Sequence, residues 1–278
     1  MSDFLQAMRE ASLARAAALA PAAGAIPERP VVPWPAGGFA VIAEIKQRSP
    51  AEGALSDGGD LGRRARRYAE AGAAAISVLT EPTRFDGALA HLEQVAAAVG
   101  ETVPVMRKDF LVHPSQVREA RAAGASGVLL IATMLGEREL ADLLAAAREH
   151  SLWVLLECFD RRDLDRVRAL LEQPAHAERA ARGELLIGVN SRDLRTLAVV
   201  PERLAELAPL LPAAAVAVAE SGIGDARAAA RAAQLGYDAV LVGTALMREP
   251  DPARLLGELA RAGRAGRAAR GGWSRSAA

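Results

Sequence analysis

Eight short runs of apolar and β-branched residues recur along the chain and constrain its fold more than any other feature. The runs are Phe39–Lys46, Ala74–Leu79, Val103–Lys108, Gly127–Ile131, Trp153–Cys158, Leu185–Val189, Val216–Glu220 and Ala239–Val242. Between them lie longer segments rich in Ala, Leu and Arg, whose apolar residues recur every three or four positions, the period of a helix. Gly72, Gly124 and Gly236 precede three of the runs, where glycine commonly ends a helix. This alternation predicts an α/β fold.

The strands are nearly continuous apolar runs, which is typical of a parallel sheet covered by helices on both faces. Eight strand–helix units between residues 39 and 263 average about 28 residues each, as in a (β/α)8 barrel. A doubly wound open sheet is the alternative, and it usually carries a glycine-rich first turn. Here Gln47–Pro50 follow the first strand, and the chain contains no GxGxxG pattern. The sequence therefore favours a (β/α)8 TIM barrel over residues 39–263.

Two segments fall outside the repeat. Residues 1–38 form an extra N-terminal segment, in which Asp3–Leu19 have the pattern of an amphipathic helix and Pro27–Pro35 form a proline-rich connector. Residues 264–278 consist mainly of Gly, Arg and Ala without an apolar period. We expect these last residues to form a disordered tail.

Composition excludes several classes of protein. The 34 basic and 34 acidic residues give a formal net charge of +0, which argues against nucleic-acid binding. No run reaches the ~18 apolar residues of a membrane span, and the start lacks the pattern of a secretory signal. One cysteine, Cys158, cannot form an internal disulfide, so we expect a cytoplasmic protein. The four histidines lack metal-ligand spacing, so no metal is expected. The sequence does not reveal the oligomeric state, and a monomer is the working expectation.

Lysine is rare in this chain. Only Lys46 and Lys108 occur among the 34 basic residues, and Asn190 is the single asparagine. Arginine stays protonated above pH ~12, whereas lysine can shift its pKa and release a proton. In a chain that otherwise uses arginine, the two lysines either survive by chance or occupy positions where arginine cannot substitute.

Polar residues gather at the predicted carboxyl ends of the strands, where the active site of a β/α barrel is built. Glu44 and Lys46 are two positions apart and so share a face of the first strand. The others are Lys108 and Asp109 after the third strand, Glu157 on the fifth, Asn190 and Arg192 after the sixth, and Glu220 and Ser221 after the seventh. Each alone could be a structural ion pair or a turn residue, but their convergence on one rim predicts an active site.

Two turns of small residues predict a phosphate site. Ser221–Asp225 follow the seventh strand, and Gly243–Ala245 follow the eighth. Turns at these two strands open onto helix N-termini and are the usual phosphate site of this fold. Arg192 or Lys46 could supply the compensating positive charge. A phosphorylated small molecule is therefore the expected substrate class.

Seven stretches at the strand ends resemble the indole-3-glycerol phosphate synthase family. They are IAEIKQRSPAEG (42–53), SVLTEPTRFDG (77–87), PVMRKDFLV (104–112), LLECFD (155–160), IGVNSRDL (187–194), VAESGI (218–223) and VLVGTALM (240–247). They occur in the family's order and cover about residues 40–250. The resemblance implies ring closure of 1-(2-carboxyphenylamino)-1-deoxyribulose 5-phosphate, with loss of CO₂ and water, to indole-3-glycerol phosphate. It implies no metal or organic cofactor.

The resemblance also implies residue roles. Lys108 would be the general acid that protonates the substrate carbonyl, and Glu157 the general acid/base of the later dehydration. Lys46 would bind the substrate carboxylate and donate a proton to the departing hydroxide, while Glu44 and Asn190 would orient substrate hydroxyls. The phosphate would be held by Ser49, Arg192, Ser221, Gly222, Gly243 and Thr244, with Glu220 close by. The pocket for the anthranilate ring would be formed by Phe85, Phe110, Leu129, Ile131, Leu194 and Leu197, for which plain core packing is the rival interpretation.

The residue types fit this chemistry, because protons must reach first a carbonyl and then a hydroxyl. We expect burial and a neighbouring cation to lower the pKa of the acting lysine so that it donates near neutral pH. Which lysine serves which step stays open. Two positions depart from the family's usual sequence. The Ser that usually follows Ser49-Pro50 is Ala51 here, and the Ser that usually follows Gly243 is Thr244.

Two alternatives remain. A sister phosphate-binding barrel such as phosphoribosylanthranilate isomerase typically relies on a Cys/Asp pair, but Cys158 directly follows Glu157 and should face away from the lumen. A catalytically silent paralogue that binds sugar phosphates or a protein would be expected to lack Lys46, Lys108 or Glu157, all of which are present.

Overall fold

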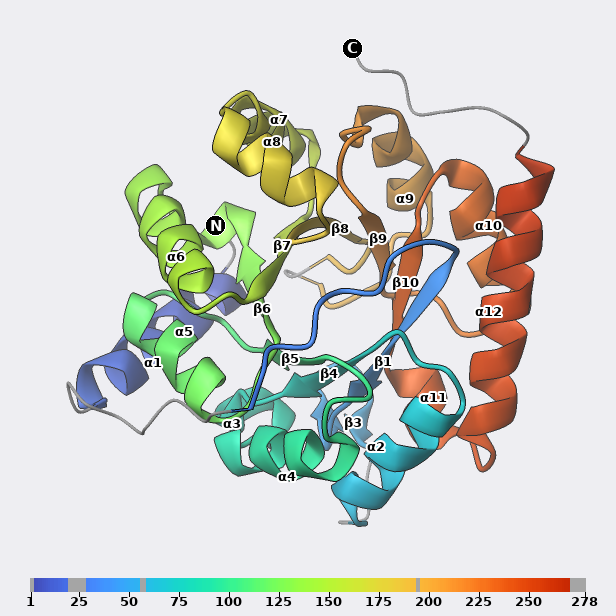
Figure 1. The fold of residues 1–278 in the computed structure, drawn as a ribbon, viewed down its shortest axis with the longest axis horizontal. Helices are drawn as coiled ribbons and strands as arrows, with labels where there is room; N and C mark the ends of the chain where they lie inside the picture. Colours follow the sequence, from blue (N-terminus) through green and yellow to red (C-terminus); the bar gives the residue numbers. More distant parts are fainter. Residues whose placement is uncertain (1–2, 20–28, 56–58, 194–195, 271–278) are drawn as a thin grey trace.

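The computed structural model describes residues 3–19, 29–55, 59–193 and 196–270. Within them, eight parallel strands close into a barrel (Figure 1). The strands are β1 (Ala40–Ile45), β4 (Ala75–Leu79), β5 (Val105–Lys108), β6 (Gly127–Ile131), β7 (Trp153–Cys158), β8 (Leu185–Asn190), β9 (Ala217–Glu220) and β10 (Ala239–Val242). The barrel closes because β1 pairs with β4 on one side and β10 on the other. The predicted (β/α)8 barrel is confirmed.

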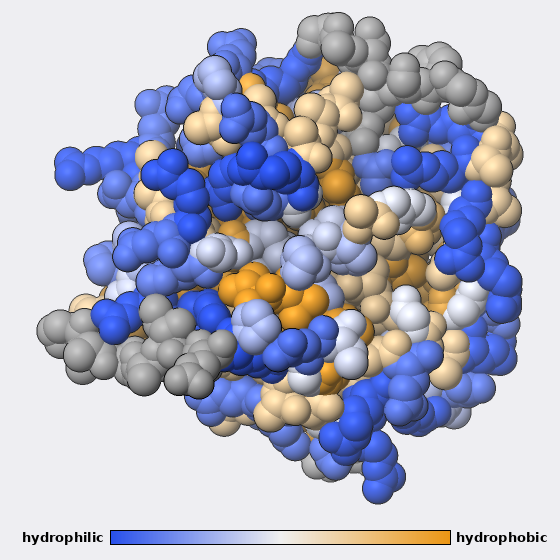
Figure 2. Space-filling model, in the orientation of Figure 1, coloured by the Kyte–Doolittle hydropathy of each residue, from blue (hydrophilic) through white to orange (hydrophobic). Residues whose placement is uncertain are grey.

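Helices form the outer layer and connect the strands. They are α2 (Leu61–Glu70), α3 (Pro82–Phe85), α4 (Leu89–Val99), α5 (Pro114–Ala122), α6 (Glu137–Glu149), α7 (Arg161–Leu171), α8 (Pro174–Ala181), α9 (Glu202–Leu207), α10 (Ala226–Leu235), α11 (Thr244–Arg248) and α12 (Pro252–Ala269). A two-stranded ribbon, β2 (Arg48–Ser49) with β3 (Gly53–Ala54), follows β1. None of the described helices is both long and apolar enough to cross a bilayer. On the face in Figure 2, hydrophilic side chains cover the outer helices and apolar ones gather near the centre.

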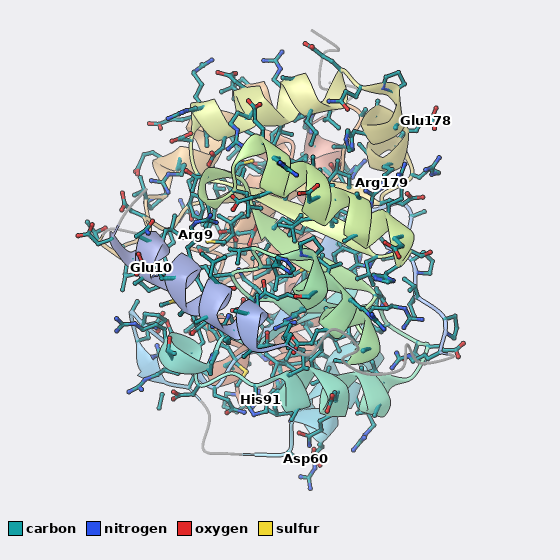
Figure 3. The ribbon with its side chains drawn as sticks, turned by 90° about the vertical axis from the view of Figure 1, so that its left-hand side faces the viewer. Arg9, Glu10, Asp60, His91, Glu178 and Arg179 are labelled. Carbon is teal, nitrogen blue, oxygen red and sulfur yellow. The ribbon has the colours of Figure 1, made fainter. Side chains whose placement is uncertain are left out.

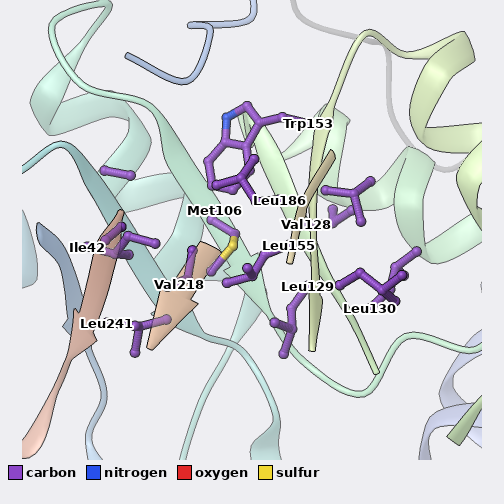
Figure 4. Close-up of a cluster of buried hydrophobic side chains, with 14 of the residues drawn as sticks. Ile42, Met106, Val128, Leu129, Leu130, Trp153, Leu155, Leu186, Val218 and Leu241 are labelled. Carbon is purple, nitrogen blue, oxygen red and sulfur yellow. The ribbon is translucent and has the colours of Figure 1, made fainter. Parts of the chain in front are cut away.

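Apolar side chains fill the barrel below its carboxyl rim. Figure 4 shows Met106, Leu155 and Leu241 within this core. At the amino end the Trp153 indole lies over Gly127, where any Cβ would collide with its ring. Trp34, from the connector before β1, packs edge-on against Trp153 with the ring centroids 5.6 Å apart. The amino end of the barrel is therefore closed by packed aromatic rings.

The predicted N-terminal helix is confirmed as α1 (Asp3–Ala18), which lies against the outside of the barrel (Figure 3). It buries Leu5 and Met8. Ser12 Oγ accepts a hydrogen bond from Gln116 Nε2 at 2.8 Å, and the Arg9 guanidinium pairs with Glu139 at 2.6 Å. The first residues of the predicted connector, 27 and 28, lie outside the described residues.

The prediction of a disordered tail from residue 264 is wrong for residues 264–269, because α12 continues through Ala269 alongside α10 (Figure 1). The glycines that suggested disorder are packing positions instead. A Cβ at Gly263 would collide with the Phe39 ring, and one at Gly266 with the backbone of Ala230. The absence of side chains lets α12 approach its neighbours closely, and this tertiary contact outweighs the low helix propensity of glycine. Residues 271–278 lie outside the described residues.

Candidate active site

The carboxyl ends of the strands surround a cavity of about 420 Å³. It is lined by every predicted site residue except Leu194, which lies outside the described residues. These residues are Glu44, Lys46, Ser49, Phe85, Lys108, Phe110, Leu129, Ile131, Glu157, Asn190, Arg192, Leu197, Glu220, Ser221, Gly222, Gly243 and Thr244. The structure thus brings the predicted site together, whereas the role of each residue stays a prediction.

Lys46 and Glu44 form an ion pair at the end of β1, with Nζ 2.7 Å from Oε1. Glu44 is buried, and burial alone would raise its pKa. Lys46 and Lys108 outweigh that effect and hold the pKa of Glu44 below its ordinary value. A Cβ at Gly243 would collide with the Glu44 carboxylate, so this glycine, directly after the neighbouring strand β10, makes room for the pair.

Lys108 lies between two carboxyl groups. Its Nζ is 3.3 Å from Glu157 Oε2 and 3.8 Å from Glu220 Oε2. Burial favours the neutral amine, but Glu157, Glu220 and Glu44 outweigh it and raise the pKa of Lys108 above its ordinary value. The prediction that burial and a neighbouring cation lower the pKa of the acting lysine is therefore wrong for Lys108. Its carboxylate neighbours keep it protonated at neutral pH.

Asp109, the residue after Lys108, also lines the cavity, and its buried carboxylate accepts four hydrogen bonds at the end of β5. Its Oδ1 accepts hydrogen bonds from the Phe110 backbone N–H at 2.8 Å and from Arg15 Nη2 of α1 at 2.7 Å. Its Oδ2 accepts from Thr80 Oγ1 at 2.8 Å and from Arg107 Nη2 at 3.1 Å. These four hydrogen bonds to Asp109 link the end of β5 to α1, to Thr80 after β4 and to the following loop, and so fix the backbone next to Lys108.

The turn after β9 has the backbone shape needed to approach an anion. Ser221 and Gly222 adopt left-handed conformations, with φ of 66° and 73°. Ser191 Oγ lies 3.1 Å from the Glu220 carbonyl and 3.0 Å from the Ser221 carbonyl and donates to this turn. Because Gly222 has no side chain, its N–H can meet a bound oxyanion directly.

Arg192 is held by its neighbours on the same side of the cavity. Its backbone N–H donates to Asn190 Oδ1 at 2.9 Å, and its guanidinium donates to the Leu197 carbonyl at 2.6 Å. The two residues are thus oriented together at the end of β8, where a phosphate or a carboxylate could meet the guanidinium.

The other side of the cavity is aromatic. The Phe85 and Phe110 rings lie 6.2 Å apart and tilted by 38°, and Phe4 of α1 meets Phe110 edge-on at 6.0 Å. Leu129 and Ile131 line the same cavity and are buried. One end of the cavity therefore suits a flat apolar ring and the other an oxyanion. The indole-3-glycerol phosphate synthase family model matches residues 6–259.

This chain belongs to the indole-3-glycerol phosphate synthase family. Among its relatives named indole-3-glycerol phosphate synthase, the protein of a Nocardioides species is 46% identical over 81% of this chain and 82% of its own. That of a Parafrankia species is 45% identical over 80% of this chain and 78% of its own. That of Salinibacter ruber is 42% identical over 80% of this chain and 77% of its own.

Solved structures of low sequence identity share the fold. The 3-hexulose-6-phosphate synthase of Salmonella typhimurium superimposes with a TM-score of 0.62 at 16% identity, over 81% of this chain and 98% of that one. The thiamine phosphate pyrophosphorylase of Pyrococcus furiosus gives a TM-score of 0.54 at 17% identity, over 82% of this chain and 96% of that one. At such identities the likeness extends to the barrel alone.

Several residues that line the cavity could not be identified from sequence patterns. Phe4 belongs to a helix whose only signal was amphipathic spacing, so nothing in the sequence directed it to the rim. Glu52 and Arg248 line the mouth and pair at 2.6 Å. Ala51, where the family usually has Ser, lines the cavity too, so the missing hydroxyl is a difference within the site itself.

Cys158 does not contribute to the cavity. Its side chain is fully buried, as its position next to Glu157 predicts, and burial raises the pKa of its thiol well above the ordinary value. It therefore cannot serve as the cysteine acid–base group of the sister isomerase. Among the residues that the structure describes, no group of three or more His, Cys, Asp or Glu side chains is arranged to hold a metal ion.

Proposed function

We propose that this protein catalyses the ring closure of 1-(2-carboxyphenylamino)-1-deoxyribulose 5-phosphate to indole-3-glycerol phosphate, a step of tryptophan biosynthesis. The observation that carries the proposal is that each of the two lysines meets a buried glutamate inside one cavity, between an end lined by aromatic rings and an end lined by Arg192 and two glycine turns. A substrate with an aromatic ring at one end and a phosphate at the other matches this polarity.

The substrate would lie across the cavity. Its anthranilate ring would pack against Phe85 and Phe110, while Arg192 and the backbone of the turns at Gly222 and Gly243 would hold the phosphate. Ser49, Ser221 and Thr244 would add hydroxyl donors. Binding at both ends holds the ring carbon close to the ketone between them, which lowers the entropic part of the barrier.

Lys108 would protonate the ketone oxygen as the aromatic carbon attacks it and the new carbon–carbon bond forms. A lysine with a raised pKa is fully protonated at neutral pH, and its proton goes to an oxygen that becomes strongly basic as the bond forms. Loss of the substrate carboxylate as CO₂ then leaves a hydroxyl on the new ring.

The last step removes that hydroxyl as water. Glu157 would act as acid/base in the dehydration, taking a proton from the new ring. Lys46, oriented by Glu44, would interact with the substrate carboxylate and then protonate the departing hydroxide. Asn190 would fix substrate hydroxyls through its side-chain amide.

The decisive experiment supplies the synthetic substrate to purified protein and follows formation of indole by absorbance and fluorescence. Parental protein should form indole-3-glycerol phosphate, and Lys108→Met should lower turnover by about 10²–10⁴-fold, the effect of losing a general acid. Folded parental protein that binds the substrate without turnover would instead support the catalytically silent barrel, and Lys108→Met at the parental rate would exclude Lys108 as the acid.

We also propose that the protein acts as a monomer in the cytoplasm. All the proposed site residues come from one chain, so a second copy is not needed to complete the cavity. The single cysteine is compatible with a reducing compartment. Light scattering coupled to gel filtration tests the oligomeric state, and a mass of twice 29.1 kDa would contradict it.

A further inference from the structure

Glu220, at the end of β9, is a buried carboxyl group to which the proposed reaction assigns no step. Its side chain lies over Gly188 of β8, where a Cβ would collide with the carboxylate. Glu220 is 1% exposed, and neither of its oxygens accepts a hydrogen bond from a donor in the described part of the chain. An ionised carboxylate without a donor is costly in such an environment.

An ionised Glu220 would have no cation of its own among the described residues. Lys46, Lys108 and Arg192 line the cavity together with the carboxyl groups of Glu44, Glu157 and Glu220, but the Arg192 guanidinium donates to the Leu197 carbonyl, and of the described residues only the two lysines lie within ion-pair distance of these carboxyl groups. Glu44 is matched by Lys46 at 2.7 Å, which leaves Lys108 as the one ammonium near both Glu157 at 3.3 Å and Glu220 at 3.8 Å. Lys108 is nearer to Glu157, so Glu220 is the carboxyl left without a matched charge.

We propose that Glu220 carries a proton in the resting enzyme and passes it to Lys108 after Lys108 has protonated the substrate. The inference rests on the function proposed above. In it Glu220 is a positioning residue that acts through Lys108.

The electrostatic surroundings support a protonated Glu220. Burial is the largest influence and raises its pKa well above the ordinary value, and the negative charge of Glu157 raises it further. Lys108 alone among its main neighbours lowers it, while Glu44 on β1 adds to the raising effect. A hydrogen bond with Glu157, which Glu220 can donate only while it keeps its proton, raises the pKa of Glu220 again.

The proton balance of the reaction gives this proton a use. A substrate carboxylate that leaves as neutral CO₂ requires the uptake of one proton in each turnover. When Lys108 gives its proton to the ketone oxygen it becomes a neutral amine. The Glu220 carboxyl then gives its proton to that amine, and the products are a carboxylate and an ammonium side by side. An amine ordinarily binds a proton more tightly than a carboxyl group, and the negative charge that forms on Glu220 raises the pKa of Lys108, so this transfer runs towards the lysine. Solvent reprotonates Glu220 after the product leaves.

Infrared spectroscopy tests the resting state directly. At pH 8, parental protein should show a carbonyl-stretch band of a protonated carboxylic acid that Glu220→Gln removes. Glu44→Gln is the matched control, because the pKa of Glu44 is lowered and its loss should remove no such band. Asp163, whose pKa is raised mainly by burial to about 6, is ionised at pH 8 and does not interfere. Parental protein without the band overturns the proposal, whatever its catalytic activity and whether or not the variant folds.

Rapid-mixing kinetics tests the transfer. Glu220→Gln starts with Lys108 protonated, so its first turnover should proceed within about threefold of the parental rate, and later turnovers should slow by roughly 10–100-fold, less than the loss of a general acid itself. Steady-state turnover of the variant should recover as pH is lowered, because solvent then supplies the proton. Equal slowing of the first and later turnovers would show that Glu220 is an ionised partner that only orients Lys108. No slowing would show that Glu220 takes no part in the reaction. Either result overturns the proposal. Parental protein that makes no product would refute the proposed function instead, with the infrared result unaffected.

Discussion

At its amino end the barrel is filled by aromatic and aliphatic side chains, whereas at its carboxyl end it is lined by charges. Trp34 and Trp153 pack edge-on at the first end, and no ion pair is needed to hold them. At the second end Glu44, Glu157 and Glu220 are buried around a cavity. Burying charge costs stability and burying aromatic surface contributes it. The amino end of the barrel therefore stabilises the fold, whereas the carboxyl end supports the proposed chemistry.

The largest expected effect is a loss of turnover from a substitution at the carboxyl end that leaves the amino end unchanged. Lys108→Arg keeps a positive charge between Glu157 and Glu220 but does not release a proton, so turnover should fall by about 10²–10⁴-fold. The measurement is the steady-state rate of indole formation, with circular dichroism and a thermal melt to show that the fold is retained. Retention of more than a tenth of the parental rate would mean that charge, not proton donation, is what this position supplies.

The corresponding change at the amino end is Trp153→Ala. Trp153 is 2% exposed, and its removal leaves a large void above Gly127, so the free energy of unfolding should fall by about 3–5 kcal/mol. Turnover per folded molecule should stay within about twofold of the parental value, because the indole is at the opposite end from the cavity. Urea denaturation followed by circular dichroism gives the first quantity. If this variant lost activity while remaining folded and stable, the division between the two ends would be wrong.

A third change tests whether buried charge at the carboxyl side costs stability. Burial raises the pKa of Asp163, at the start of α7, to about 6, against about 3.9 for an unfolded chain. Between these values the native state binds more protons than the unfolded state, so Asp163 lowers stability as pH rises and the full loss is present above pH ~6. Asp163→Asn should therefore stabilise the protein by about 1–3 kcal/mol at pH 8 and by little at pH 4.

Thermal melts at the two pH values check this prediction, with Asp165→Asn on the same helix as the control. The Asp163 carboxylate accepts a hydrogen bond from the Phe159 backbone N–H at 2.9 Å, which the Asn carbonyl can replace. A loss of stability at pH 8 would mean that this hydrogen bond outweighs the cost of burying the charge.

The smallest expected effect concerns the aromatic side of the cavity. Phe4→Ala removes the edge-on contact with Phe110, so KM should rise by about 2- to 10-fold with turnover nearly unchanged, as expected for one aromatic pair. Leu13→Ala is a matched control on the same helix, because Leu13 is 41% exposed and should leave KM unchanged. A fall in turnover without a change in KM would place Phe4 in the chemistry and not in binding.

Local patterns were enough to predict the strands and the rim. β6, β7 and β10 begin and end at the residues that the apolar runs predicted, and Glu44, Lys108 and Glu157 all reach the cavity. Strand alternation and the direction of a parallel sheet fix which side chains point inwards and at which end they gather, so both follow from short-range sequence.

Contacts between distant segments could not be predicted in the same way. The bond between Arg15 and Asp109 joins residues 94 positions apart, and neither residue carries a pattern that names the other. Residues 264–269 look disordered until Gly266 is seen against Ala230. The direction of the Lys108 pKa shift likewise depends on how many carboxyl groups surround it in space. Each requires knowledge of the packed structure.

The pair of Trp34 and Trp153 also has an optical consequence. The proposed product contains an indole ring that forms at the carboxyl end, while these two native indoles pack edge-on at the amino end. Their near-ultraviolet circular dichroism should therefore remain constant while substrate binds and reacts. In one sample, the circular dichroism of Trp34 and Trp153 would then report unfolding, while the absorbance of the new indole would report product formation.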